Sequence, residues 1–224
     1  MISFPAPTRS PHPPMSARSA LQWLERGLIV LGLALVALWL KNESDSRAFQ
    51  VAESKRLEAG LRETGLVGPP SPETATRAKR PPGLEKGVLG RLEIPRLGIS
   101  AMVAEGTDTR LLKRAVGHIT TTALPGRPGN VGLAGHRDTF LRGLGNAREN
   151  DLIRFVTLRG TYIYKVEWGA VVEPGRVDVL DSTATQSMTL VTCYPFQAVG
   201  PAPQRFVVRA RQVVPAVSAS TAAR

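Results

Sequence analysis

The sequence is poor in the residues that commonly cross-link small proteins. Its 224 residues include one cysteine and three histidines. A single cysteine excludes an intrachain disulfide and any zinc site built from several cysteines. Aromatic residues make up only 5% of the chain, but hydrophobic residues make up 42%, which is enough for a core. The length allows one domain of ordinary size with appendages, or two small domains.

Acidic residues are scarce relative to basic ones, with 18 Asp and Glu against 29 Lys and Arg, for a net charge of +11. Within residues 89–213, 16 basic and 10 acidic side chains are spread along the segment instead of forming a run. Nucleic-acid-binding proteins usually cluster Lys and Arg on one face or one helix. We therefore expect no nucleic-acid partner and a diffuse basic surface, which is also compatible with attraction to anionic lipid or a cell-wall polymer.

One stretch near the N-terminus is strongly apolar. Gly27–Leu40 has 14 residues without a charged side chain, about 21 Å as a helix, and the hydrocarbon core of a membrane is about 30 Å thick. The helix can extend back to Leu21, and no small-residue cleavage site follows Leu40. We therefore predict a retained transmembrane anchor over residues 21–40 rather than a cleaved signal peptide. The alternative is a buried helix of a soluble protein.

The charges around this stretch predict its orientation. The charged residues before the uncharged run are mainly basic (Arg9, Arg18 and Arg26), whereas the residues after it carry mixed charge. The positive-inside rule then places the N-terminus in the cytoplasm and the rest of the chain on the outer side of the cell membrane, as a single-pass protein.

Composition divides the remaining chain. Residues 1–20 are rich in proline and predict a disordered cytoplasmic leader. Residues 41–85 predict a spacer that is helical at first and then Pro-rich and stiff. Residues 86–213 predict a folded domain, and residues 214–224 a disordered tail.

The folded domain has a β texture, because short apolar or alternating runs are separated by Gly, Pro, Asn and Asp. Seven strands are predicted, at Val88–Ile94, Ala101–Ala104, Asn130–Gly135, Leu152–Leu158, Thr161–Val172, Ser187–Cys193 and Arg205–Val213. Short strands at this spacing are typical of an all-β barrel or sandwich. A short helix is expected over Thr107–Arg114 with Thr107 as its cap, and a hairpin turn at Arg159-Gly160.

Alternation assigns side chains to the two faces of a strand. In the last strand Phe206, Val208 and Ala210 share the inward face, so Arg205 and Arg209 should point outward toward a groove or solvent. In the longest strand four residues share one face: Tyr162, Tyr164, Val166 and Trp168.

A cysteine and a histidine stand at ends of predicted strands. Cys193 comes just before Pro195, where the chain breaks and a thiol can be accessible; a buried, inert thiol is the alternative. His136 follows the strand that begins at Asn130, and His118 is the competing histidine. Thiol chemistry near neutral pH needs a base of this kind to generate the thiolate.

Acyl transfer also needs positive charge or N–H donors at the developing oxyanion. Arg205 stands 12 residues after Cys193 and could supply that charge. Arg209 lies on the same predicted face, so spacing leaves the choice between the two arginines open.

Three segments of the sequence resemble sortases, the cysteine transpeptidases of bacterial surfaces. TLVTC at 189–193 resembles their TLxTC motif, and ALPGRPGNVGLAGHRDTF at 123–140 resembles the segment that carries their catalytic histidine. The GHRDTF form, the YPF after the cysteine and the APQRFVVRA ending are most similar to class D-type sortases. The resemblance covers about residues 86–213, behind the predicted anchor.

The resemblance implies a fold and a set of site residues. The fold would be all-β, a closed eight-stranded barrel with short helices, with the eighth strand near Ala115–Ile119 or from a split of 161–172. Residues 86–213 would be the catalytic domain. The implied roles are nucleophile for Cys193, general acid/base for His136 and oxyanion stabilisation for Arg205. Thr192 and Arg209 are further candidates for substrate binding. No cofactor or metal is expected, since no dense acidic loop is present.

The reaction implied by the resemblance is cleavage of an LPxTG-like C-terminal sorting signal between Thr and Gly, through a thioacyl-enzyme. The acceptor would be an amine, from a lipid-linked peptidoglycan precursor or a pilin lysine. Two alternatives remain at this stage. One is a thiol hydrolase of the same fold, and the other is a non-enzymatic anchored barrel that binds the envelope.

Overall fold

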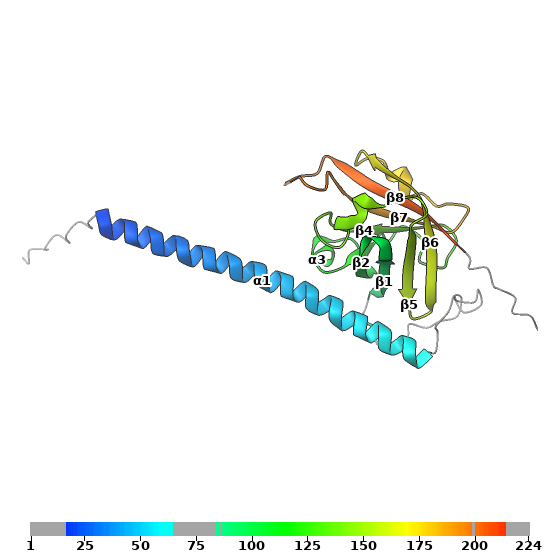
Figure 1. Ribbon diagram of the computed structural model, residues 1–224, viewed down its shortest axis with the longest axis horizontal. Helices are drawn as coiled ribbons and strands as arrows, with labels where there is room; N and C mark the ends of the chain where they lie inside the picture. Colours follow the sequence, from blue (N-terminus) through cyan, green and yellow to red (C-terminus); the bar gives the residue numbers. More distant parts are fainter. Residues whose placement is uncertain (1–16, 65–83, 86, 199, 214–224) are drawn as a thin grey trace, which may run out of the picture. The chain divides into compact units, whose positions relative to one another are not determined.

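The computed structural model describes residues 17–64, 84–85, 87–198 and 200–213, which include one long helix and a β-barrel (Figure 1). The strands are β1 (Val88–Ile94), β2 (Ile99–Glu105), β3 (Val116–His118), β4 (Asn130–Ala134), β5 (Leu152–Thr157), β6 (Gly160–Val172), β7 (Ser187–Tyr194) and β8 (Gln204–Gln212). The helices are α1 (Ala17–Thr64) and α3 (Thr109–Leu112), with 3-10 turns η1 (Pro95–Leu97), η2 (Arg142–Asn146) and η3 (Val177–Leu180). Most of the predicted leader (1–16), the Pro-rich part of the spacer (65–83) and the tail (214–224) lie outside the described residues.

The strands close into a barrel in the order β1-β2-β3-β4-β7-β8-β6-β5. Most neighbours are antiparallel, but β2 and β3 run parallel, as do β4 and β7. β1 closes the ring by pairing with β5, where Leu92 lies opposite Phe155. Closure removes the free edges that an open sheet would expose. The predicted fold class is confirmed, and the eighth strand is β3, at the first of the two expected positions.

Alternating side chains fill the barrel. Along β1, buried and partly exposed residues alternate without a break. The largest wholly buried side chains are Tyr164 and Phe155, from the neighbouring strands β6 and β5. On β8, Val208 and Ala210 lie in the core and Phe206 packs against it, as predicted. Burial of each larger apolar side chain contributes about 1.5–3 kcal/mol, so this interior stabilises the barrel.

A bulge in β6 overturns one predicted face. Tyr162, Tyr164 and Val166 point into the core as expected. The register against β8 then shifts between Val166 and Trp168, and Trp168 is 38% exposed, opposite Arg209. The prediction that Trp168 shares the inward face is therefore wrong. An inserted residue reverses the alternation from that point on.

Two local predictions also need correction. Asp108, not Thr107, caps α3, because its Oδ1 accepts hydrogen bonds of 3.0 Å from the N–H groups of Arg110 and Leu111. An aspartate carboxylate is a strong acceptor at this position. In the β5–β6 hairpin Thr157 pairs with Gly160, so the turn lies one residue earlier than Arg159-Gly160.

The predicted membrane anchor lies within α1. Among the described residues, one helical stretch, Leu21–Arg62, is long and apolar enough to cross a membrane, with a mean hydropathy of 1.8 in its most apolar part. The chain divides into two compact units between Ser44 and Asp45.

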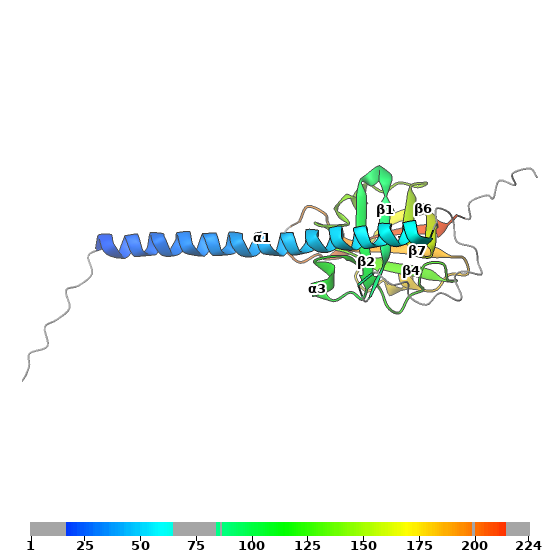
Figure 2. The ribbon, with the colours of Figure 1, turned by 90° about the horizontal axis from the view of Figure 1, so that it is seen from below.

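The last turns of α1, from residue 45 on, belong to the same unit as the barrel and pack on β1 and β2 (Figure 2). Gln50 donates from Nε2 to the Arg114 carbonyl (2.7 Å), and its Oε1 accepts from the Met102 N–H (2.8 Å). Leu57 is completely buried in a second apolar cluster that includes Met102. Glu53 is also buried, at 1% exposed. The helical part of the spacer is therefore docked on the barrel wall.

Candidate active site

Cys193 and Arg205 lie directly opposite each other in the antiparallel β7·β8 ladder. Directly opposed residues in such a ladder point to the same face, with Cβ atoms about 4.5–5.5 Å apart. The predicted proximity of the thiol and an arginine therefore follows from the strand register. Both residues are half-buried, so a substrate can reach them.

His136 reaches the same end of β7 from the other side. β4 runs parallel to β7, with Ala134 beside Val191. The contact continues past the end of β4, because the Gly135 carbonyl accepts a 2.8 Å hydrogen bond from Thr192 Oγ1 and the Gly135 N–H donates to the Val191 carbonyl (3.2 Å). Continuing this parallel register by one residue places His136 next to Cys193.

The thiol is free and accessible. Cys193 is unbridged and half-buried, whereas residues 187–190 at the start of β7 are buried. Arg205 is held by its own segment: its Nη1 donates to the Ala202 carbonyl (3.2 Å) and to the Gln204 carbonyl (2.9 Å). The strand register thus places the thiol opposite the guanidinium, and the imidazole belongs to the residue after Gly135, which contacts Thr192.

Thr192 faces away from this surface. It is 2% exposed, and its hydroxyl donates to Gly135, the residue before His136. In this structure Thr192 therefore ties the cysteine strand to the histidine segment.

The competing histidine lies inside the barrel wall. His118 is 1% exposed. Its Nδ1 is 3.0 Å from Glu105 Oε1, and its Nε2 is 3.0 Å from the Ala123 carbonyl and 3.2 Å from Thr122 Oγ1. Nδ1 therefore links His118 to the end of β2, and Nε2 holds the segment between β3 and β4.

No carboxylate orients His136 in the part of the chain that the structure describes. Asp138, two residues after His136, is exposed and has no described bond to the imidazole. A Cys–His–Asp relay is therefore not assembled among these residues.

Arg209 lies away from the thiol. It pairs with Thr189, four residues along β7 from Cys193, which is about 13 Å of strand. Its Nη2 donates to the Val179 carbonyl (2.6 Å), and its guanidinium lies 5.8 Å from the Trp168 ring. Burial lowers the pKa of Arg209, an effect that Glu167 opposes. Arg209 thus holds η3 against the outer face of the sheet.

Two sets of polar side chains that hold segments packed beside β7 were not identified from the sequence. Asn130 Nδ2 donates to the Val179 carbonyl at 3.2 Å beside Arg209, and the Thr189 hydroxyl donates to Asn130 Oδ1 at 2.8 Å, so Asn130 and Arg209 fix η3. Arg137, directly after His136, is 9% exposed and donates to main-chain carbonyls of the β7–β8 connection. The only feature of the sequence that points to Arg137 is its position directly after His136.

The arrangement suits acyl transfer. A thiol can attack a carbonyl carbon, an imidazole can move protons, and a guanidinium can stabilise an oxyanion. Among the described residues, no three His, Cys, Asp or Glu side chains gather into a group that could hold a metal ion.

Known proteins resemble this chain over the barrel. The Sortase domain family matches residues 92–213, more than half of the chain, and this range contains His136, Cys193 and Arg205. Sortase D of Bacillus subtilis is 32% identical over 125 residues, which cover 55% of this chain and 63% of that protein. The chain thus matches slightly less than two thirds of that curated relative.

Solved structures share the fold. The Sortase D5 transpeptidase of Clostridium perfringens superposes with a TM-score of 0.57 at 24% identity, covering 76% of this chain and 99% of that chain. Sortase C-1 of Actinomyces oris superposes with a TM-score of 0.52 at 30% identity, covering 58% and 75%. The chain belongs to the sortase family.

Proposed function

We propose that the protein is a membrane-anchored cysteine transpeptidase that cleaves an LPxTG-like sorting signal between Thr and Gly and transfers the surface protein to an amine. The observation that supports the proposal is the pairing of Cys193 with Arg205 near the end of β7, where the Gly135 segment that precedes His136 also contacts β7. This set supplies a nucleophile, an oxyanion partner and a proton carrier from three separate segments.

In the first half-reaction, the Cys193 thiolate attacks the carbonyl carbon of the Thr–Gly bond. A C–S bond forms, and the carbonyl oxygen becomes an oxyanion that the Arg205 guanidinium stabilises. The His136 imidazolium gives its proton to the glycine nitrogen as the C–N bond breaks. The products are a thioacyl-enzyme and a free glycine amine.

In the second half-reaction, an amine of the acceptor attacks the thioacyl carbon. His136 takes the proton from the attacking nitrogen, an amide bond forms, and the C–S bond breaks to release the Cys193 thiolate. The acceptor is a lipid-linked peptidoglycan precursor or a pilin lysine. Attack by water instead would yield a free carboxylate, which is hydrolysis.

The apolar part of α1 provides the anchor in this proposal. The basic residues before it place the N-terminus in the cytoplasm, so the barrel lies on the outer side of the cell membrane. Surface proteins and envelope precursors are exposed on that side.

The test uses the full chain in detergent, with an LPxTG-type peptide and with or without an amine nucleophile such as a glycine peptide. We expect peptide cleavage, and an amide-linked product by mass spectrometry only when the amine is present. The Cys193→Ala variant should keep its melting temperature and lose cleavage.

Each other outcome has a clear meaning. Cleavage that persists in Cys193→Ala would refute the proposal. Release of the carboxylate alone, with amine in excess, would favour the hydrolase. No cleavage of any sorting peptide, together with slow reaction of Cys193 toward a thiol reagent, would favour the binding barrel.

A further inference from the structure

Arg137 is a buried arginine bonded to main-chain carbonyls. Its side chain is 9% exposed. Its Nη1 donates to the Pro195 carbonyl at 3.0 Å, and its Nη2 donates to the Gly200 carbonyl at 2.8 Å. A buried cation is unfavourable unless it is hydrogen-bonded, so these two bonds hold the guanidinium and the two carbonyls together.

The two carbonyls bracket the connection between the cysteine strand and the arginine strand. Pro195 comes two residues after Cys193, and Gly200 comes five residues before Arg205. The β7·β8 ladder ends at the pair Tyr194 and Gln204, so strand pairing does not hold this connection. Arg137 therefore fixes a segment that the ladder leaves unpaired.

The same connection orients Arg205. Its guanidinium Nη1 donates to the carbonyls of Ala202 and Gln204, at 3.2 Å and 2.9 Å. Ala202 lies in the connection, whereas Gln204 is the first residue of β8, so displacing the connection would remove the Ala202 acceptor and loosen the Arg205 guanidinium. Because Arg137 follows His136 directly, it also ties the connection to the segment that carries the imidazole.

We propose that Arg137 is a positioning residue for the transpeptidation: it holds the β7–β8 connection so that the Arg205 guanidinium stays in place beside Cys193 and His136. The inference rests on the proposed function, because it assigns Arg205 to the oxyanion. A planar guanidinium can reach two carbonyls at once, which the single ammonium of a lysine cannot do in the same fixed geometry.

A second contact keeps the connection attached when Arg137 is removed. Phe196 packs edge-on against Tyr194 and Phe206, with ring centroids 6.1 Å and 5.5 Å apart. A Cβ at Gly145 would come within 2.7 Å of the Phe196 ring, which shows how closely that residue sits. Loss of Arg137 should therefore loosen Arg205 without unfolding the barrel.

A double-mutant cycle with Arg205 tests the inference, using peptide cleavage to measure kcat and KM. We expect Arg137→Ala to lower kcat by about 10- to 100-fold, with KM within about twofold, because only the stabilisation of the transition state is lost. The Arg137→Ala/Arg205→Ala variant should be no slower than Arg205→Ala alone, to within about threefold, since both changes remove the same interaction.

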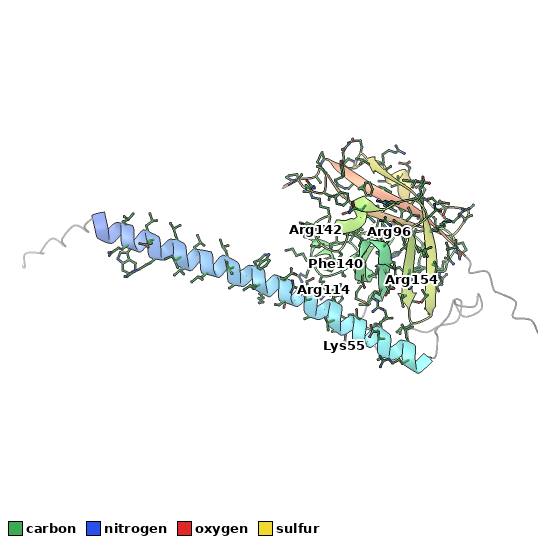
Figure 3. All side chains as sticks on the ribbon, in the orientation of Figure 1. Lys55, Arg96, Arg114, Phe140, Arg142 and Arg154 are labelled. Atoms are coloured by element: carbon green, nitrogen blue, oxygen red, sulfur yellow. The ribbon has the colours of Figure 1, made fainter. Side chains whose placement is uncertain are left out.

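The matched control is Arg142→Ala. Arg142, labelled in Figure 3, is an exposed arginine of η2 that lines the same hollow of about 830 Å³ as Arg137. The Arg142→Ala substitution removes one positive charge from the same region. We expect its kcat to stay within about twofold of wild type. Amides of the β7–β8 connection should exchange with deuterium faster in Arg137→Ala and at the wild-type rate in Arg142→Ala.

Three results would overturn the inference. The first is a fall in kcat in the double variant equal to the product of the falls in the two single variants. The second is a fall in kcat in Arg142→Ala as large as in Arg137→Ala. The third is full activity in Arg137→Lys, which retains the charge but cannot bond to both carbonyls in the same geometry. If Arg137→Ala does not fold, the cycle is run with Arg137→Lys under the same criteria. A wild-type chain that cleaves no sorting peptide would instead refute the proposed function itself.

Discussion

Cys193 lies opposite Arg205 at the next-to-last pair of the β7·β8 ladder, and only Tyr194 and Gln204 pair beyond it. The register thus places a thiol and a guanidinium side by side at the point where the two strands separate. A substrate carbonyl that reaches the thiol there also reaches the cation. The position of the pair at the end of the ladder also explains why the β7–β8 connection matters for its geometry.

The two arginines of β8 should differ in kinetics. Arg205→Ala should lower kcat for peptide cleavage by about 100- to 1,000-fold, because the proposed oxyanion donor is lost. Arg209→Ala should leave kcat within about threefold, because Arg209 lies about 13 Å along the strand from Cys193 and its guanidinium bonds to the Val179 carbonyl. Steady-state kinetics of both variants measure this difference, and an equal fall in kcat would contradict it.

Substitutions of the two histidines of the barrel should have different effects, one on catalysis and the other on stability. His136→Ala should lower cleavage by about 100- to 10,000-fold, as expected for a general acid/base, with little change in stability. His118→Phe should keep kcat within about threefold but lower the free energy of unfolding by about 1–3 kcal/mol, because the imidazole's hydrogen bonds to the Ala123 carbonyl and Glu105 are lost. Kinetics and urea unfolding of both variants test the assignment. A His118→Phe enzyme that is stable but inactive would reverse it.

Docking of α1 on the barrel can be tested at Leu57. This side chain is completely buried between the helix and the wall, so Leu57→Ala should lower the free energy of unfolding of the full chain in detergent by about 2–5 kcal/mol. Val51 is 53% exposed on the same part of the helix, and Val51→Ala should cost no more than about 0.5 kcal/mol. Equal effects of the two variants would mean that the helix does not pack on the barrel.

Acid should weaken a contact between η1 and the turn before β5. Asp151 accepts hydrogen bonds from Arg96 Nη2 (2.6 Å) and from the Arg148 N–H (2.8 Å). The hydrogen-bonded Arg96 guanidinium lowers the pKa of Asp151, although burial opposes the shift. A carboxyl whose folded pKa is lowered stabilises the protein above its unfolded pKa of about 3.9, and this contribution is lost as the pH falls through the folded pKa.

The measurement is the free energy of unfolding between pH 6 and pH 2, values chosen to bracket the unfolded pKa of about 3.9. Asp151→Asn should lose stability at pH 6 and show a shallower fall below about pH 4 than the wild type. Glu149→Gln removes a carboxylate from the same turn and is the control. A wild-type and an Asp151→Asn curve of equal slope would show that this ion pair does not contribute.

Much of the fold follows from the sequence by itself. Period-two alternation and the Gly, Pro and Asn breaks locate seven of the strands and the inward face of β8. An uncharged apolar run predicts the anchor, and the motifs around His136 and Cys193 indicate the family. These signals are local, because each depends only on residues a few positions apart.

Tertiary structure alone decided which residues meet at the site. Arg205 and Arg209 share a face by alternation, and only the register of β7 against β8 shows which one lies beside Cys193. Likewise, the parallel pairing of β4 with β7 and the contact of Gly135 with Thr192 place the segment of His136, and not that of His118, beside the end of the cysteine strand. Arg137 could not be assigned from the sequence, since its carbonyl partners lie 58 and 63 residues further along the chain. Alternation determines the face of a side chain, but register between distant segments determines its neighbours, and that depends on how the whole barrel packs and closes.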